Sequence, residues 1–91
     1  MEPFTSDDEV IERVNDTTYG LASYVWTNDT ARGMRFADRI AAGSVSINKG
    51  GPPSPEVLWA GYKQSGLGVE GTNHGLEAFT QLKQISVDLN P

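Results

Sequence analysis

The sequence contains no cysteine and only one histidine. The lack of cysteine excludes disulfides, cysteine-containing zinc sites and a cysteine nucleophile within these 91 residues. The single histidine, His74, does not supply a histidine-cluster metal site, and it stands beside Gly75 at an expected helix start. A lone histidine in that position is more often a cap or a surface residue than a general base. We therefore predict no metal ligand and no catalytic residue in this chain.

Basic residues and long apolar runs are also scarce. Twelve acidic side chains stand against seven basic ones, which gives a formal charge of -5 and a pI near 4.6. Binding to nucleic acid or to an anionic membrane surface depends on clustered lysine and arginine, so both are disfavoured. No apolar run approaches the about 18–20 residues of a membrane span, and the N-terminus lacks a basic-then-apolar signal segment. We expect a cytoplasmic or organelle-matrix protein without nucleic-acid or membrane partners.

Apolar residues are too few for a large core. They make up 37% of the sequence, the mean hydropathy is -0.40, and ten residues are glycine. A chain of this length forms one domain at most, and it buries only about 60–65% of the surface that its unfolded form exposes. Glycine also raises the backbone entropy that is lost on folding. We therefore expect marginal stability without a partner.

The first element that the sequence predicts is a helix after Ser6. Ser6 and Glu9 have the spacing of a capping box, and acidic residues fill the first turn, where they favour the helix dipole. Apolar residues recur at helical spacing at Val10, Ile11 and Val14. The pattern predicts an amphipathic helix that ends at residues 15–16.

A strand–helix–strand unit follows. Residues 24–27 form a β-branched and aromatic run, residues 28–43 show a helical pattern closed by Gly43, and residues 44–48 read as a second strand. The face of this helix that we expect to be buried contains Met34, Ala37, Ile40 and Ala41. A crossover helix between two strands implies parallel pairing. The predicted fold class is α/β with a partial parallel sheet.

The second half of the chain is richer in turn-forming residues. Residues 49–73 contain six glycines and three prolines, and an irregular stretch of this length is usually functional or disordered. A third, short helix is expected over residues 74–81. Ile85, Val87 and Leu89 then alternate with polar residues, which predicts a half-buried strand. An unpaired strand of this kind associates readily, so self-association or a bound partner is expected.

One glycine pattern in the sequence is typical of nucleotide-binding sites in other proteins. Gly66, Gly68 and Gly71 in SGLGVEG have the G-x-G-x-x-G spacing of dinucleotide-binding folds. That motif needs a buried strand before its first glycine, whereas WAGYKQS precedes it here. We interpret the glycines as a loop, and a miniature nucleotide binder ranks last among the functional hypotheses.

Three blocks of sequence together resemble the NAD(P)-dependent aldehyde dehydrogenase superfamily. They are VNDTTYGLA at 14–22, GSVSIN at 43–48 and AGYKQSGLGVEG at 60–71, in the order and spacing of the family's C-terminal portion. The similarity covers residues 4–87. The chain departs from the usual pattern at Trp59-Ala60, where Phe-Gly is usual, and at Val69, where Arg is usual.

The resemblance implies a division of the chain. Residues 1–83 correspond to the last part of an aldehyde dehydrogenase-like catalytic domain, and residues 84–91 to a strand that extends a sheet of another subunit. Oligomerisation through Ile85, Val87 and Leu89 is therefore expected. In the family the loop after Asn48 lines the substrate tunnel, which makes four residues candidates for a substrate loop: Lys49, Pro53, Ser54 and Trp59.

The same resemblance implies a function. In the family a cysteine thiolate attacks an aldehyde, hydride passes to NAD(P)+, and hydrolysis of the thioester releases the acid. The family's cysteine, general-base glutamate and cofactor domain lie upstream of the segment matched here. We therefore expect a C-terminal fragment, excised or from a truncated reading frame, that is not catalytically competent and binds no cofactor alone, while NAD or NADP serves the parent enzyme. The alternative is a stand-alone, non-catalytic module that acts by strand pairing.

Overall fold

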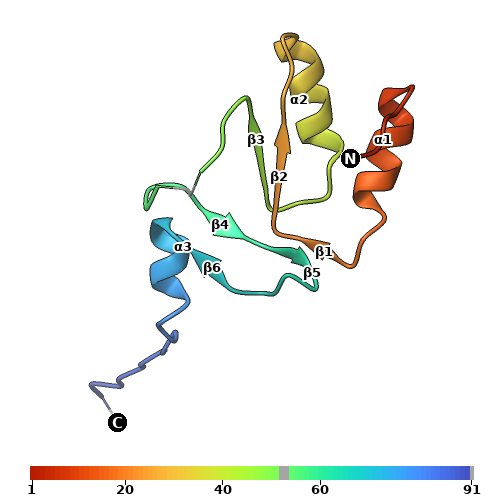
Figure 1. Ribbon diagram of the computed structural model, residues 1–91. Coiled ribbons are helices and arrows are strands. Elements are labelled where there is room, and N and C mark those ends of the chain that lie inside the picture. Colours follow the sequence, from red (N-terminus) through yellow and green to blue (C-terminus); the bar gives the residue numbers. More distant parts are fainter. Residues whose placement is uncertain (52–53, 91) are drawn as a thin grey trace.

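The computed structural model describes residues 1–51 and 54–90, which form three helices and six short strands. Their order along the chain can be followed in Figure 1. The elements are α1 (Asp7–Asn15), β1 (Tyr19–Gly20), β2 (Ala22–Val25), α2 (Thr30–Arg39), β3 (Ser44–Ile47), β4 (Trp59–Ala60), β5 (Tyr62–Lys63), β6 (Val69–Glu70) and α3 (Thr72–Glu77).

Helix α1 begins where the capping residues place it. Ser6 is extended, with φ -140°, and its hydroxyl accepts a hydrogen bond of 3.2 Å from the Glu9 N–H. The Glu9 carboxylate accepts hydrogen bonds from the backbone N–H and the hydroxyl of Thr5, at 3.0 and 2.9 Å. The cap at Asp16 closes the helix through its N–H, which donates to the carbonyl of Glu12 at 3.0 Å. The predicted start and end of this helix are confirmed.

Strands β2 and β3 pair in parallel, and α2 connects them (Figure 1). The register joins Ala22 to Ser44 and Val25 to Ile47. Helix α2 packs against β3 and lies beside α1 (Figure 1). This is the strand–helix–strand order that the sequence indicates, with the first strand beginning two residues earlier than expected.

Two details of α2 differ from the prediction. The helix ends at Arg39, and its C-cap Ile40 has an extended ψ of 125°, so Gly43 is not the closing residue. The buried side of the helix contains Gly33 and Phe36 as well as Ile40, whereas Met34 is 52% exposed. The reason is the close approach of Gly33 to β3: a Cβ atom there would lie 3.0 Å from the side chain of Ile47. This contact turns the Gly33 side of the helix toward the sheet.

The glycine-rich second half is more ordered than its composition suggests. Strands β4 and β6 pair antiparallel, with Trp59 opposite Glu70, and β5 pairs antiparallel with β1, with Lys63 opposite Tyr19. Each of these ladders is two residues long on either side. A run of two residues has no measurable hydrophobic period, which is why the sequence predicted none of them.

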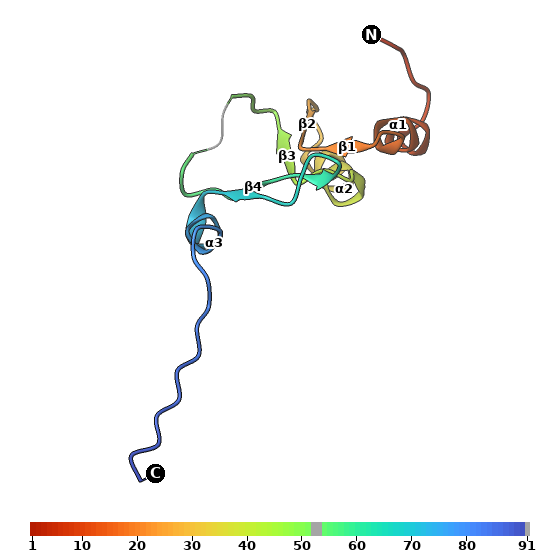
Figure 2. The same ribbon diagram turned by 90° about the horizontal axis from the view of Figure 1, so that it is seen from below.

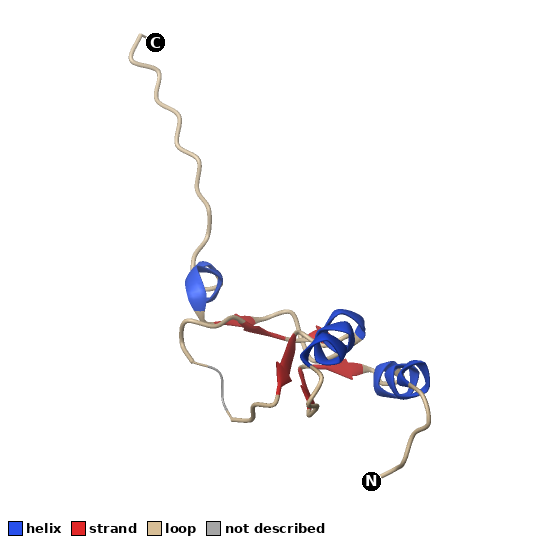
Figure 3. Cartoon of the chain, turned by 90° about the horizontal axis from the view of Figure 1, so that it is seen from above, coloured by secondary structure: helices blue, strands red, loops and turns tan. Residues whose placement is uncertain are grey.

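The C-terminal segment extends away from the rest of the chain. Helix α3 spans Thr72–Glu77 rather than residues 74–81, and the backbone beyond it is extended (Figures 2 and 3). The radius of gyration is 19.1 Å and the longest dimension is 73 Å. A compact chain of this length has a radius of gyration of about 12 Å. Within the described residues the segment pairs with no strand, so the strand expected at residues 84–89 stays a prediction.

The core is small. Among the described residues the buried hydrophobic side chains are Ile11, Phe36 and Ile40, from α1 and α2. Four half-buried residues pack around them: Val10, Val25, Ala42 and Val45. The core therefore lies between the two longer helices and the parallel strand pair.

Candidate functional site

The loop at residues 49–58 connects β3 to β4 and contains most of the candidate site residues. Its first end is fixed by Asn48, which has a left-handed φ of 54°. The Asn48 side chain accepts a hydrogen bond from the Thr27 N–H and donates one to the Thr27 carbonyl, both at 2.8 Å. The Asn48 N–H also donates to the carbonyl of Val25 at 2.8 Å. These hydrogen bonds hold the start of the loop against the end of the parallel strand pair.

The second end of the loop lies against the turn between β6 and α3. The Val57 N–H donates to the Ser54 carbonyl at 3.0 Å, and the Thr72 N–H donates to the Pro55 carbonyl at 3.2 Å. Gly71, with φ 75°, lies so close that a Cβ atom there would be 2.4 Å from the carbonyl oxygen of Val57. Only a glycine allows this approach, because the contact is with rigid backbone.

The predicted substrate-loop residues have different surroundings. Lys49 and Ser54 are exposed, and Pro53 lies outside the described residues. Trp59 is half-buried, and its indole Nε1 is buried without a hydrogen-bond partner in the described part of the chain. The backbone N–H of Glu56 and then the Ser54 hydroxyl hydrogen-bond the Glu56 carboxylate, which lowers its pKa. Lys49, Ser54 and Glu56 thus lie in the loop, and Trp59 follows it at the start of β4.

The three sequence blocks meet at one junction. The Lys63 ammonium donates to the carbonyls of Asn15 and Thr17, at 2.9 and 3.1 Å. The Gly20 N–H donates to the Ser65 hydroxyl at 2.9 Å, and the Gly43 N–H donates to the Gly20 carbonyl at 3.0 Å. Residues far apart in the sequence are thus joined by hydrogen bonds that need these side chains and glycines at these positions.

The glycines of SGLGVEG belong to this junction and its connections. Gly66, with φ 114°, follows β5, and β6 separates it from Gly71. The element before Gly66 is a two-residue strand paired antiparallel with β1, and the helix after Gly71 has six residues. The segment therefore has the glycine spacing of a dinucleotide site, but Gly66 and Gly68 lie in the turn between β5 and β6, and Gly71 connects β6 to α3.

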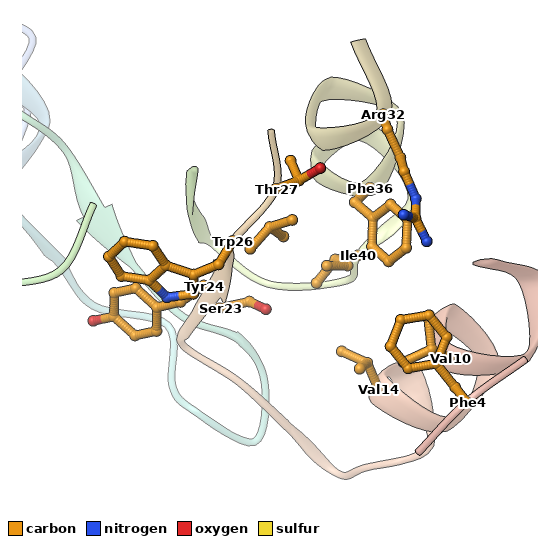
Figure 4. Close-up of a pocket in the computed structure, with 11 residues that line it drawn as sticks. Phe4, Val10, Val14, Ser23, Tyr24, Trp26, Thr27, Arg32, Phe36 and Ile40 are labelled. Atoms are coloured by element: carbon orange, nitrogen blue, oxygen red, sulfur yellow. The ribbon is translucent and has the colours of Figure 1, made fainter. Parts of the chain in front are cut away.

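A hollow of about 210 Å³ lies between α1, β2 and α2. Figure 4 shows Val10, Val14 and Phe4 on one side of it and Phe36 and Ile40 on the other. The guanidinium of Arg32 lies 5.7 Å from the centre of the Phe36 ring and forms an ion pair with Asp7. The lining is mainly apolar, and Tyr24 and Trp26 extend it along the exposed side of β2 (Figure 4).

Metal-binding and membrane-spanning features are absent from the described residues. No group of three or more histidine, cysteine or acidic side chains there is placed to hold a metal ion. His74 lies in α3, exposed, with its Nδ1 atom 3.3 Å from the Thr72 hydroxyl. None of the described helices has the length and apolar character needed to cross a bilayer.

Sequence reasoning missed Asn48 and Gly71 as residues of this site. Both lie inside motif blocks, where Asn48 ends GSVSIN and Gly71 ends SGLGVEG. A non-glycine residue that tolerates the left-handed region, placed directly after a strand, is the signal that could have found Asn48.

A sequence profile of the aldehyde dehydrogenase family matches residues 1–85. The chain belongs to this family. It is 44% identical over 91 residues to betaine aldehyde dehydrogenase of Bacillus subtilis (strain 168). The aligned region covers 100% of this chain and 19% of that protein.

Solved aldehyde dehydrogenases share the fold. A mutant of betaine aldehyde dehydrogenase from Staphylococcus aureus superposes with a TM-score of 0.89 at 39% identity, over 99% of this chain and 18% of that chain. An NAD+ complex of aldehyde dehydrogenase from Bacillus cereus gives a TM-score of 0.87 at 39% identity, over 98% and 18% of the two chains. The chain thus spans about a fifth of the length of the relatives that it matches.

Proposed function

We propose that this chain is the C-terminal part of an NAD(P)-dependent aldehyde dehydrogenase. Residues 1–83 complete the catalytic domain and supply the substrate loop, and residues 84–91 form a subunit contact. The parent reaction converts an aldehyde, NAD(P)+ and water into a carboxylate, NAD(P)H and two protons. The 91 residues contain no cysteine, so the nucleophile of that reaction comes from another part of the enzyme.

The observation that carries this proposal is the large number of exposed hydrophobic side chains. Only three hydrophobic side chains are buried among the described residues, while many large ones are exposed, including Trp26, Leu67, Phe79 and Leu82. Soluble monomers rarely expose large contiguous apolar patches, which usually mark interaction surfaces. A segment that packs against the remaining four-fifths of an aldehyde dehydrogenase accounts for these residues.

A chimeric enzyme tests the proposal. The matching C-terminal segment of the B. subtilis betaine aldehyde dehydrogenase is replaced by this chain, and NADH formation is measured with betaine aldehyde and a panel of other aldehydes. We expect an assembled, active dehydrogenase, whereas the host enzyme truncated before the segment should be inactive. A chimera that folds and binds NAD+ but oxidises none of the aldehydes would contradict the proposal.

The alternative function is a stand-alone module that acts by strand pairing. The extended segment at 84–89, with exposed Ile85, Val87 and Leu89, favours it, because such an edge can join the sheet of a partner. The two functions differ in the behaviour of the chain alone. A defined, stable oligomer of the isolated 91-residue chain, together with an inactive chimera, would favour the module.

A further inference from the structure

Strand β2 has one edge without a neighbouring strand. Among the described residues, β2 pairs only with β3, in parallel. The Val25 carbonyl accepts a hydrogen bond of 2.8 Å from the N–H of Asn48, directly after β3, so the backbone groups of Val25 face β3. Neighbouring residues of a strand direct their N–H and carbonyl groups to opposite edges. The N–H and the carbonyl of Tyr24 therefore face the free edge, where a further strand would supply their hydrogen-bond partners.

The strand pair also lacks cover on the face opposite the helices. Val25 of β2 and Val45 of β3 contact the core under α1 and α2, whereas Tyr24 and Trp26 are 50% and 70% exposed. Parallel sheets are usually covered on both faces, and their strands are apolar on both. The side chains of β2 are thus typical of an internal strand in a larger sheet.

Helix α1 has the position of a crossover that leads into β2. Ile11 of α1 and Phe36 of α2 share one core cluster, so both helices cover the same face of the strand pair. Figure 1 shows the two helices beside each other, each running opposite in direction to β2. Helix α2 connects two parallel strands, β2 and β3. By the same rule of right-handed crossovers, a helix that leads into β2 from this layer starts at a parallel strand next to β2.

The hollow of about 210 Å³ between α1, β2 and α2 lies where the side chains of that strand would pack. Val10 and Val14 line it from α1, and Phe36 and Ile40 line it from the side of α2 (Figure 4). Phe4, shortly before the start of α1, lines the same hollow, so the chain enters α1 from this edge of the sheet. The apolar walls favour a strand whose side chains on this face are apolar.

We infer that the free edge of β2 receives a third parallel strand, supplied by the segment of the parent enzyme that leads into α1, and that apolar side chains of this strand fill the hollow. The inference rests on the proposed function, because it takes the strand from the part of the enzyme outside this chain. The charged side chain that lines the hollow, Arg32, is already paired with Asp7, so the strand needs no charge there. A strand from a second copy of the chain would fill the edge but would leave the position of α1 unexplained.

Amide exchange in the chimeric enzyme and in the 91-residue chain tests this inference. The Tyr24 amide should exchange at least about a hundredfold more slowly in the chimera, because the added strand accepts its hydrogen bond. The Ser44 amide, which donates to Leu21 across the existing pair, should be protected in both proteins. A folded chimera in which Tyr24 exchanges as fast as in the isolated chain would overturn the inference. Protection of Tyr24 in the isolated chain that rises with protein concentration would also overturn it, because a second copy then fills the edge.

Proline at the same position gives a second test. Tyr24→Pro removes the N–H that faces the free edge, and Tyr24→Ala, the matched control, removes the side chain but keeps the N–H. In the 91-residue chain the two variants should unfold at the same urea concentration, because this N–H faces the edge that lacks a strand. In the chimera Tyr24→Pro should lower the yield of assembled enzyme, measured by gel filtration, at least about tenfold below Tyr24→Ala. Equal yields of the two chimeras would contradict the added strand.

The readouts separate this inference from the proposed function. A folded chimera that protects Tyr24 but oxidises no aldehyde would contradict the proposed function and support the added strand. An active chimera whose Tyr24 amide stays unprotected would support the proposed function and overturn the inference.

Discussion

At the scale of single residues, glycines mark the positions where the sequence blocks touch. A Cβ atom at Gly43 would lie 1.5 Å from the carbonyl oxygen of Ala60, and one at Gly20 would lie 2.5 Å from that of Ala41. The atoms that a Cβ would meet belong to the main chain, so they cannot rotate out of the way as the end of a flexible side chain can. Gly20 and Gly43 are therefore required by the packing of distant segments.

Gly43→Ala tests this requirement. We expect it to destabilise the fold by about 3 kcal/mol or more, beyond the usual range for overpacking, because β3 and β4 must separate to admit the methyl group. Gly50→Ala is the matched control, since a Cβ atom there meets nothing within 4 Å. Urea unfolding followed by circular dichroism measures both. Equal stability of the two variants would rule out the close contact.

A second residue-scale prediction concerns acid. The guanidinium of Arg32 donates to Asp7 from Nε at 3.1 Å and from Nη2 at 2.5 Å, and these hydrogen bonds hold the pKa of Asp7 below its usual value of 3.8. A carboxyl group whose pKa is lower in the folded state stabilises the fold above its unfolded pKa, and the stabilisation is lost as the pH falls through the folded value.

Asp7→Asn should therefore lower the melting temperature at neutral pH and lose this effect progressively as the pH falls below 3.8. The ion pair is partly exposed, so added salt should shrink the difference. Asp38→Asn, on the exposed side of α2, serves as the control. A difference between Asp7→Asn and the parent chain that is the same at every pH would contradict the assignment.

At the scale of elements, α1 and α2 hold most of the core. Phe36 contacts the α1 side of the core and lies under the Arg32 guanidinium, whereas Met34, two residues away on the same helix, is 52% exposed. Sequence periodicity placed Met34 on the buried side because it counts apolar residues and does not register that Gly33 can approach a strand closely.

Phe36→Ala should cost about 3–5 kcal/mol, because it opens a cavity in a core with few other side chains to fill it. Met34→Ala should change stability by less than about 0.5 kcal/mol, as expected for an exposed position. Thermal unfolding of both variants distinguishes the two faces of α2. If the Met34 variant loses as much stability as the Phe36 variant, the helix is rotated from the orientation described.

At the scale of the whole molecule, the chain is elongated because its C-terminal segment extends away from the rest (Figure 2). Its longest dimension of 73 Å comes from the segment after α3, where Ile85, Val87 and Leu89 are 76%, 74% and 84% exposed. Exposed apolar residues at every second position are typical of a strand that pairs with a partner. We predict that this segment associates with another subunit or with another sheet edge.

Val87→Lys should abolish that association, because the ammonium group would have to be buried against the partner. Ser86→Lys is the control, since the neighbouring position points to the other face of an extended chain. Light scattering on the 91-residue chain and on the chimeric enzyme measures the assembly. An unchanged oligomer in Val87→Lys would exclude this segment from the contact.

The sequence by itself determined the local elements and the family. The capping residues of α1, the strand–helix–strand order and the three motif blocks are all readable along the chain, because each depends on neighbours within a few residues. The sequence also placed the candidate loop at 49–58, through the resemblance that those blocks carry.

Only the tertiary structure decided how the blocks fit together and what holds the loop. The two-residue ladders, the Lys63 contacts with Asn15 and Thr17, and the contacts of Asn48 and Gly71 join residues more than ten positions apart. Such contacts depend on the path of the backbone between them, and no local period or spacing records that path. The segment SGLGVEG illustrates this, since its glycine spacing suggests a nucleotide site, whereas in the structure Gly71 lies against the carbonyl oxygens of Val57 and Pro55.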